Sequence, residues 1–123
     1  MSPTQRSLAY LRKAGYHVGI VERWMAFAHG GIRVDLWNFA DLIAFRFGLP
    51  VMLIQTTTAS NAAARRKKLL GNSIARDWVL AGNELVLHKW ALRGEKGQRK
   101  TWGCDAEWLE KDAFAPEEAV GAA

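Results

Sequence analysis

Cysteine is almost absent from this chain of 123 residues, since Cys104 is the only one. A single cysteine cannot form an internal disulfide bond, and the first residues lack the basic-then-apolar order of a secretory signal peptide. The longest stretch without a charged residue, 47–64, turns polar halfway, so no segment supplies the roughly 20 apolar residues that span a bilayer. We therefore expect a cytoplasmic protein that does not enter a membrane.

Several common site signatures are missing as well. Gly30 and Gly31 are not followed by the Lys-Ser/Thr pair of a phosphate-binding loop. The histidines at 17, 29 and 88 do not have metal-binding spacing, which predicts core or surface roles for them. Cys104 lacks a Cys-His-Asp order and is expected to be a small apolar filler.

Acidic residues are scarce in the first 100 positions, which hold 16 Lys and Arg against 6 Asp and Glu, whereas residues 101–123 hold 1 against 6. So basic a body is expected to attract polyanions, of which nucleic acid is the commonest in a cytoplasm. A solvated surface is the alternative. The residues predicted to contact nucleic acid are Arg65, Arg66, Lys67, Lys68, Lys89, Arg93, Lys96, Arg99 and Lys100.

Half of the residues are hydrophobic, which is enough for one packed domain, expected at 1–110, followed by an acidic and flexible tail at 111–123. Ser2 and Pro3 predict a helix start, and the pair Gly71-Asn72 is expected to bend or break a second helix that begins at Ser60. Hydrophobic patterning predicts strands at 16–24, 41–45, 51–57, 85–89 and 100–104. The predicted fold is α/β in the order α-β-β-β-α-β-β, with a small mixed sheet flanked by helices.

The strand at 51–57 changes character midway, because four apolar residues are followed by Gln55 and three threonines. Such polar strand ends are where α/β sheets place functional sites. With a period of two, Gln55 and Thr57 share one face, and a hairpin partner beginning at Asp41 would bring a carboxylate close to them. The candidate site is therefore Asp41, Gln55 and Thr57.

A family resemblance rests on the order of these elements and on three segments, 4–18, 40–45 and 51–57. In this order the chain resembles the PD-(D/E)XK nuclease superfamily, in particular the archaeal Holliday-junction-resolvase type. The resemblance implies a restriction-endonuclease-like core, with Ala40-Asp41 at the position of the Pro-Asp pair and 55–57 at that of Glu-x-Lys. It also implies that the protein acts on DNA, branched or single-stranded, as a homodimer.

The resemblance implies catalytic roles for Asp41, Gln55, Thr57 and Gln5, and a Mg²⁺ or Mn²⁺ site formed by Asp41, Gln55 and the Thr56 carbonyl. The motif is degenerate, because Gln5 and Gln55 replace carboxylates and Thr57 replaces the lysine. A neutral carbonyl oxygen still suits a hard cation. Arg65 or Arg66 would then supply the missing positive charge, and Asp35 or Glu22 would replace a carboxylate if either converges on Asp41.

Alternatives stay open for several of these residues. Gln5 also fits a helix capping box, and 56–60 also fit a strand exit that leads into a helix cap. Trp90 and Trp102 either stack on nucleic-acid bases or cover strand faces, with Trp24, Trp78 and Trp108 in the core. For the whole chain, the predictions are a metal-dependent endonuclease or an inactive nuclease fold that binds nucleic acid or a protein partner.

Overall fold

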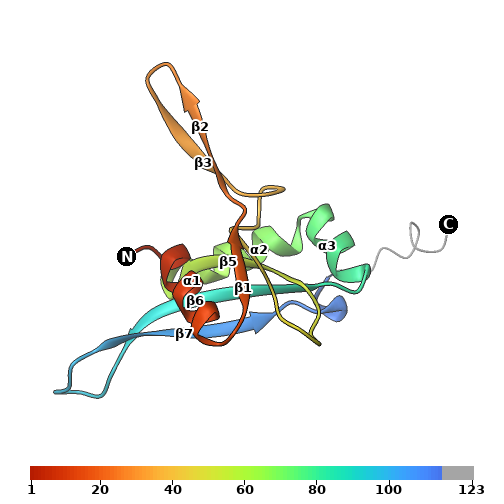
Figure 1. Ribbon diagram of the computed structural model, residues 1–123. Coiled ribbons are helices and arrows are strands. Elements are labelled where there is room, and N and C mark those ends of the chain that lie inside the picture. Colours follow the sequence, from red (N-terminus) through yellow and green to blue (C-terminus); the bar gives the residue numbers. More distant parts are fainter. Residues whose placement is uncertain (115–123) are drawn as a thin grey trace.

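The computed structural model describes residues 1–114 as a mixed five-stranded sheet with helices on both faces (Figure 1). The sheet has the order β1-β4-β5-β6-β7, in which β5 and β6 are parallel and all other neighbours are antiparallel. Its strands are β1 (His17–Ile20), β4 (Leu42–Phe45), β5 (Met52–Thr58), β6 (Glu84–Arg93) and β7 (Thr101–Trp108). The predicted mixed α/β class is confirmed, since each of the five predicted strands contributes to this sheet.

The helices begin and end close to the expected signals. They are α1 (Pro3–Lys13), α2 (Ala62–Leu70) and α3 (Ser73–Leu80), with short 3₁₀ turns η1 (Ala59–Asn61) and η2 (Lys111–Ala113). The Ser2 hydroxyl caps α1 by accepting a hydrogen bond from the Gln5 N–H. The predicted break at Gly71-Asn72 is confirmed, because the Asn72 side chain caps a new helix, α3.

Two hydrophobic clusters explain why β5 is buried on both faces. Leu8 and Leu11 of α1 pack against Ile54 and its neighbours on one face of the sheet. Leu53 of β5 lies in the other cluster, together with residues of α2 and α3. Burial on both sides matches the continuous apolar run at the start of β5.

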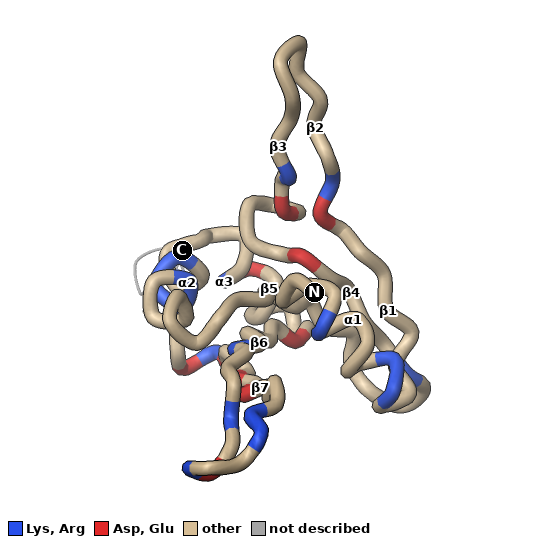
Figure 2. The backbone as a smooth tube through the Cα atoms, turned by 90° about the vertical axis from the view of Figure 1, so that its left-hand side faces the viewer, with Lys and Arg blue, Asp and Glu red and all other residues tan. Residues whose placement is uncertain are grey.

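The predicted strand at 16–24 is wrong in its extent. The chain leaves the sheet after Ile20, and the N–H groups of Val21 and Glu22 donate to the Asp41 carbonyl. A two-stranded hairpin then follows, formed by β2 (Arg23–Phe27) and β3 (Gly30–Val34). This β2–β3 hairpin projects from the body (Figures 1 and 2) and was not predicted, because its apolar side chains are not buried.

The C-terminal part of the described chain also extends past its predicted limits. Strand β7 continues to Trp108, and the core continues past residue 110 because Phe114 is buried among residues of the α2/α3 side. The remainder of the predicted flexible tail, 115–123, lies outside the described residues. Within residues 1–114, every helix is too short or too polar to cross a membrane.

Candidate metal and phosphate site

Asp41 lies immediately before β4, level with Gln55 of β5, because Leu42 is the register partner of Ile54. Its carboxylate accepts a hydrogen bond from the Thr56 N–H at 2.8 Å and from the Thr56 hydroxyl at 3.2 Å. The side chain is almost completely buried. The structure thus brings Asp41 to the polar end of β5, as the hairpin spacing predicts.

A tight loop returns the chain from Asp35 to Asp41. Leu36 and Ala40 exchange backbone hydrogen bonds at 2.9 Å in both directions. Trp37 and Asn38, at the tip of this loop, adopt left-handed conformations with φ of 51° and 70°. Non-glycine residues rarely adopt such angles, so this loop has a defined and locally strained conformation that holds Asp35 beside Asp41.

Glu22 completes a group of three carboxylates. One carboxylate oxygen each from Glu22, Asp35 and Asp41 lies within 4.8 Å of the others. Glu22 directly precedes β2 and Asp35 directly follows β3, so the first pair of the β2–β3 hairpin, Arg23 with Val34, holds the two acids next to each other. Both residues that sequence reasoning named as replacement carboxylates therefore converge on Asp41, as Figure 2 indicates by the acidic segments at the hairpin base.

The environment of Asp41 strongly favours its protonated form. Burial raises the pKa of Asp41 to about 8, with further contributions from a hydrogen bond with Asp35 and from the charges of Asp35 and Glu22, while the Thr56 N–H acts in the opposite direction. Arg33 balances part of the negative charge by an ion pair with Glu22 at 3.0 Å. A bound cation would remove the repulsion that raises this pKa.

Gln55 supplies a second and independent indication of a ligand. The side chain is 1% exposed, and its Nε2 lies 3.4 Å from Asp35 Oδ2 and 3.5 Å from Asp41 Oδ2, which are long for hydrogen bonds. Its Oε1 is buried and, among residues 1–114, has no hydrogen-bond partner. A buried amide oxygen without a donor is unfavourable. Rotation of the side-chain amide would turn Oε1 towards the two acids, where a hard cation would bind it.

The three acids line a cavity of about 570 Å³ that also contains basic side chains. Arg33, Arg65 and Lys68 lie on its wall, and they are more exposed than Asp41. Carboxylates bind cations and guanidinium or ammonium groups bind phosphate oxygens, so the cavity offers ligands for both partners of a metal–phosphate complex. Thr4 closes one side, with its hydroxyl 2.9 Å from that of Thr56.

Of the remaining predicted site residues, Thr56 contacts Asp41, whereas Thr57 and Gln5 lie outside its cavity. Thr57 is buried beside Lys89 of β6 and does not line the cavity of Asp41. Gln5 is exposed and lies in a neighbouring hollow, whereas Thr4 takes the place on α1 that faces β5. Thr56 reaches Asp41 through its N–H and hydroxyl. Its carbonyl points to the same side of the strand as its N–H, towards β4.

The predicted nucleic-acid contacts fall into two groups. Arg66 and Lys89 are engaged by Glu107 of β7, at 2.8 Å and 3.1 Å, so part of their charge is neutralised. The other group is exposed or lines the cavity and consists of Arg65, Lys67, Lys68, Arg93, Lys96, Arg99 and Lys100. Figure 2 shows the basic segments on α2 and around the β6–β7 turn.

The exposure of several tryptophans differs from what the sequence suggests. Trp90 is 6% exposed and donates from Nε1 to the Ser7 hydroxyl, which favours, of its two alternatives, the one in which it covers a strand face. Trp102 is exposed, and the Arg6 guanidinium lies 4.1 Å from its ring centroid. Trp24 and Trp108 are also exposed, which contradicts their predicted place in the core.

The single thiol is unsuited to nucleophilic chemistry. Burial raises the pKa of Cys104 to about 11, with a smaller contribution from the charge of Asp105, so the thiol stays protonated at neutral pH.

Comparison of the chain with protein-family models, curated proteins and solved structures finds no match to any of them. The arguments for function therefore rest on the geometry of the site.

Proposed function

We propose that this protein binds nucleic acid and hydrolyses phosphodiester bonds with a Mg²⁺ or Mn²⁺ ion held at Asp41. The observation that carries the proposal is the convergence of Glu22, Asp35 and Asp41 beside Gln55, whose buried Oε1 has no hydrogen-bond partner among residues 1–114. Such oxygen ligands suit hard divalent cations, and the resemblance to PD-(D/E)XK nucleases supports the same chemistry. We further propose that it acts in the cytoplasm as a homodimer.

In this proposal Asp41 and Asp35 are the anionic ligands, and Gln55 contributes its amide oxygen after rotation of the side-chain amide. The ion would polarise the phosphoryl group and activate a water molecule. Arg65 and Lys68, which line the same cavity, would contact the phosphate oxygens and stabilise developing negative charge. Arg65 would thereby replace the lysine that the resemblance places at Thr57, whereas Arg66 pairs with Glu107 instead.

A second candidate is an inactive nuclease fold that binds nucleic acid or a protein partner. Two observations favour it. Thr57 is buried outside the cavity, and Arg33 already neutralises Glu22 through a 3.0 Å ion pair. A site that has lost its lysine and one carboxylate would retain the basic surface for recognition without cleaving the ligand.

The experiment that separates the two candidates measures cation binding and cleavage with the same variants. Calorimetric titration with Mn²⁺ compares the wild type, Asp41→Asn and Asp35→Asn with Asp77→Asn, a matched change of an exposed aspartate on α3. Labelled linear, single-stranded and four-way-junction DNA, and a single-stranded RNA, are then incubated with Mg²⁺, Mn²⁺ or EDTA.

Under the nuclease proposal, the wild type and Asp77→Asn bind Mn²⁺ and cut at least one substrate, and Asp41→Asn does neither. Binding of nucleic acid without cutting under any metal would favour the inactive fold. A wild type that binds neither cation nor nucleic acid would refute both nucleic-acid candidates and leave the protein-partner alternative.

A further inference from the structure

The β2–β3 hairpin exposes apolar side chains that the core of the protein does not use. Met25 and Ile32 are register partners and therefore lie on the same face, which Phe27 shares because it follows Met25 by two positions. All three side chains are exposed. The hairpin extends away from the body in both views (Figures 1 and 2), so the described chain does not cover this face.

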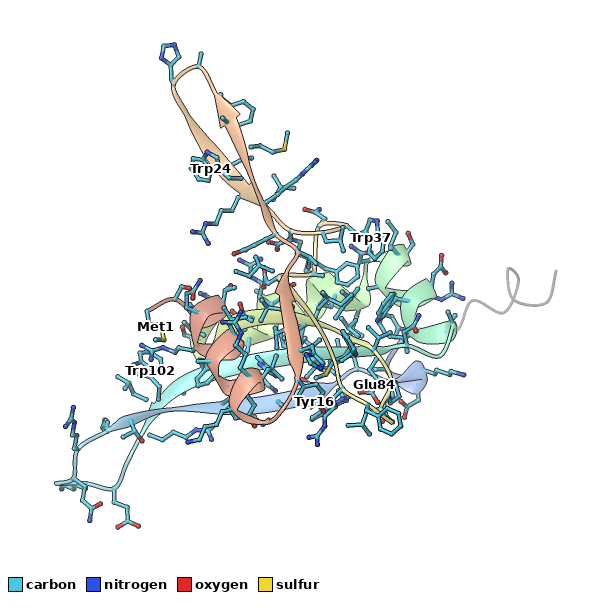
Figure 3. All side chains as sticks on the ribbon, viewed as in Figure 1. Met1, Tyr16, Trp24, Trp37, Glu84 and Trp102 are labelled. Carbon is cyan, nitrogen blue, oxygen red and sulfur yellow. The ribbon has the colours of Figure 1, made fainter. Side chains whose placement is uncertain are left out.

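Trp24 lies on the opposite face, and its position is fixed by a glycine. A Cβ atom at Gly31 would lie 2.5 Å from Cζ2 of Trp24, so the indole crosses the backbone of the neighbouring strand where only glycine leaves room. Trp24 is nevertheless 62% exposed, and its ring lies against one face of the hairpin (Figure 3). A large aromatic surface is therefore presented to solvent in a defined orientation.

The charge of the hairpin indicates the class of its partner. Residues 23–34 contain Arg23, Arg33 and His29 and no acidic residue. Basic residues combined with exposed aromatics are typical of surfaces that contact single-stranded nucleic acid, where bases stack and phosphates pair with arginine. A second copy of this chain is a poorer partner, because it carries a net charge of +5 and would bring like charges together.

The base of the hairpin adjoins the candidate metal site. A hollow of about 380 Å³ lies between the hairpin and α1, and it shares Glu22 and Arg33 with the cavity of Asp41. Arg23 and Trp24 line this hollow. A nucleotide held there would be adjacent in space to a phosphate in the cavity of Asp41.

We propose that the β2–β3 hairpin is a nucleobase-contacting arm. It stacks an unpaired base on Trp24, contacts the backbone phosphate with Arg23, and lays the face of Met25, Phe27 and Ile32 against further bases. The inference rests on the proposed function, because it takes nucleic acid as the ligand. The arm adds a surface that contacts unpaired bases. A site made only of carboxylates and phosphate contacts cannot distinguish unpaired from paired bases.

The test measures binding in EDTA, where no metal-dependent cleavage occurs. Fluorescence anisotropy with a labelled single-stranded 20-mer and the matching blunt duplex compares the wild type with Trp24→Ala and the double variant Trp24→Ala/Phe27→Ala. Phe47→Ala is the control, since Phe47 is a fully exposed aromatic in the β4–β5 turn. Trp24→Phe retains a stacking ring. Melting curves confirm that each variant is folded.

We expect the double variant to bind the single strand about tenfold more weakly, with less than a twofold change for the duplex. Trp24→Phe should retain most of the affinity, and Phe47→Ala all of it. The same loss in an Asp41→Asn background would support the arm even if the metal chemistry is absent.

Three outcomes overturn the arm. Equal binding by the double variant and the wild type removes the arm but leaves the proposed function intact. A wild type that binds no nucleic acid refutes the arm and the proposed function together. A dimer that becomes monomeric in the double variant, with DNA binding unchanged in sedimentation and anisotropy, would assign the hairpin to a second copy of the chain.

Discussion

The Ser7 hydroxyl oxygen lies 2.8 Å from Nδ1 of His88, although 81 residues separate the two in the chain. The same oxygen accepts a hydrogen bond from Trp90 Nε1, because an indole N–H can only donate. Burial lowers the pKa of His88, so its ring is neutral at pH 7. This network joins α1 to β6, and its complete burial makes it structural.

Acid should destabilise the fold through His88. Burial lowers the pKa of His88 from 6.5 to about 4, so the unfolded chain binds its proton more readily than the folded chain. The stability that His88 contributes is complete above pH 6.5 and is lost as the pH falls from 6.5 towards 4. Urea unfolding between pH 7 and 4 should show a steeper loss for the wild type than for His88→Phe. Equal slopes would contradict this prediction.

Removal of the buried Ser7 hydroxyl should lower the stability of the fold, although it deletes only one oxygen atom. Ser7→Ala leaves His88 Nδ1 and Trp90 Nε1 buried without their partner, which is expected to lower the free energy of unfolding by about 1–3 kcal/mol. Ser60→Ala, at an exposed hydroxyl beside Thr58, should change it by less than about 0.5 kcal/mol. Chemical denaturation of both variants measures the difference.

Asp41 should have the opposite pH dependence in the absence of a cation. Its pKa is raised from 3.8 to about 8, so the folded state retains a proton that the unfolded state has lost. Stability therefore falls as the pH rises from 3.8 to 8, by at most about 1.4 kcal/mol for each pH unit. In EDTA at pH 8, Asp41→Asn should melt at a higher temperature than the wild type. A lower melting temperature would refute the raised pKa.

Glu107 should weaken the binding of nucleic acid by neutralising Arg66 and Lys89. Although burial raises its pKa, hydrogen bonds from Arg66 and Lys89 hold the pKa of Glu107 below its usual value, so it stays ionised and engages both cations. Glu107→Gln should strengthen DNA binding and steepen its salt dependence, because each released cation adds a phosphate contact. Anisotropy titrations across NaCl concentrations test this. Glu110→Gln, an exposed residue with the same charge change, should have a smaller effect.

The strands of the sheet and the pairing of Asp41 with Gln55 could be predicted because both follow from local patterns. An apolar run that ends in Gln55 and three threonines indicates a buried strand with a polar end, and a short connection sets its antiparallel partner. The displacement of Gln5 by Thr4 was also accessible, since Leu8 and Leu11 already define the buried stripe of α1, on which position 4 lies and position 5 does not.

The convergence of Glu22 and Asp35 depends on contacts that a sequence pattern does not contain. It requires the chain to leave the sheet after Ile20, where two N–H groups bind the Asp41 carbonyl, and a left-handed turn at Trp37 and Asn38. Burial patterns likewise do not identify the β2–β3 hairpin, because its alternating apolar residues face solvent. Trp90, on β6, is buried against α1, whereas Trp102, on the neighbouring strand β7, is exposed, and the sequence around them does not distinguish the two environments.

The pairing of Arg23 with Val34 has a consequence for how this protein can change. Because this pair fixes the distance between the two carboxylates that flank it, the intervening segment can be shortened, lengthened or exchanged at its tip without altering the acidic group. The length of the hairpin and the geometry of the acidic group are thus set by different stretches of the chain. Variation at 28–29 would change the tip of the hairpin while the positions of Glu22 and Asp35 stay the same.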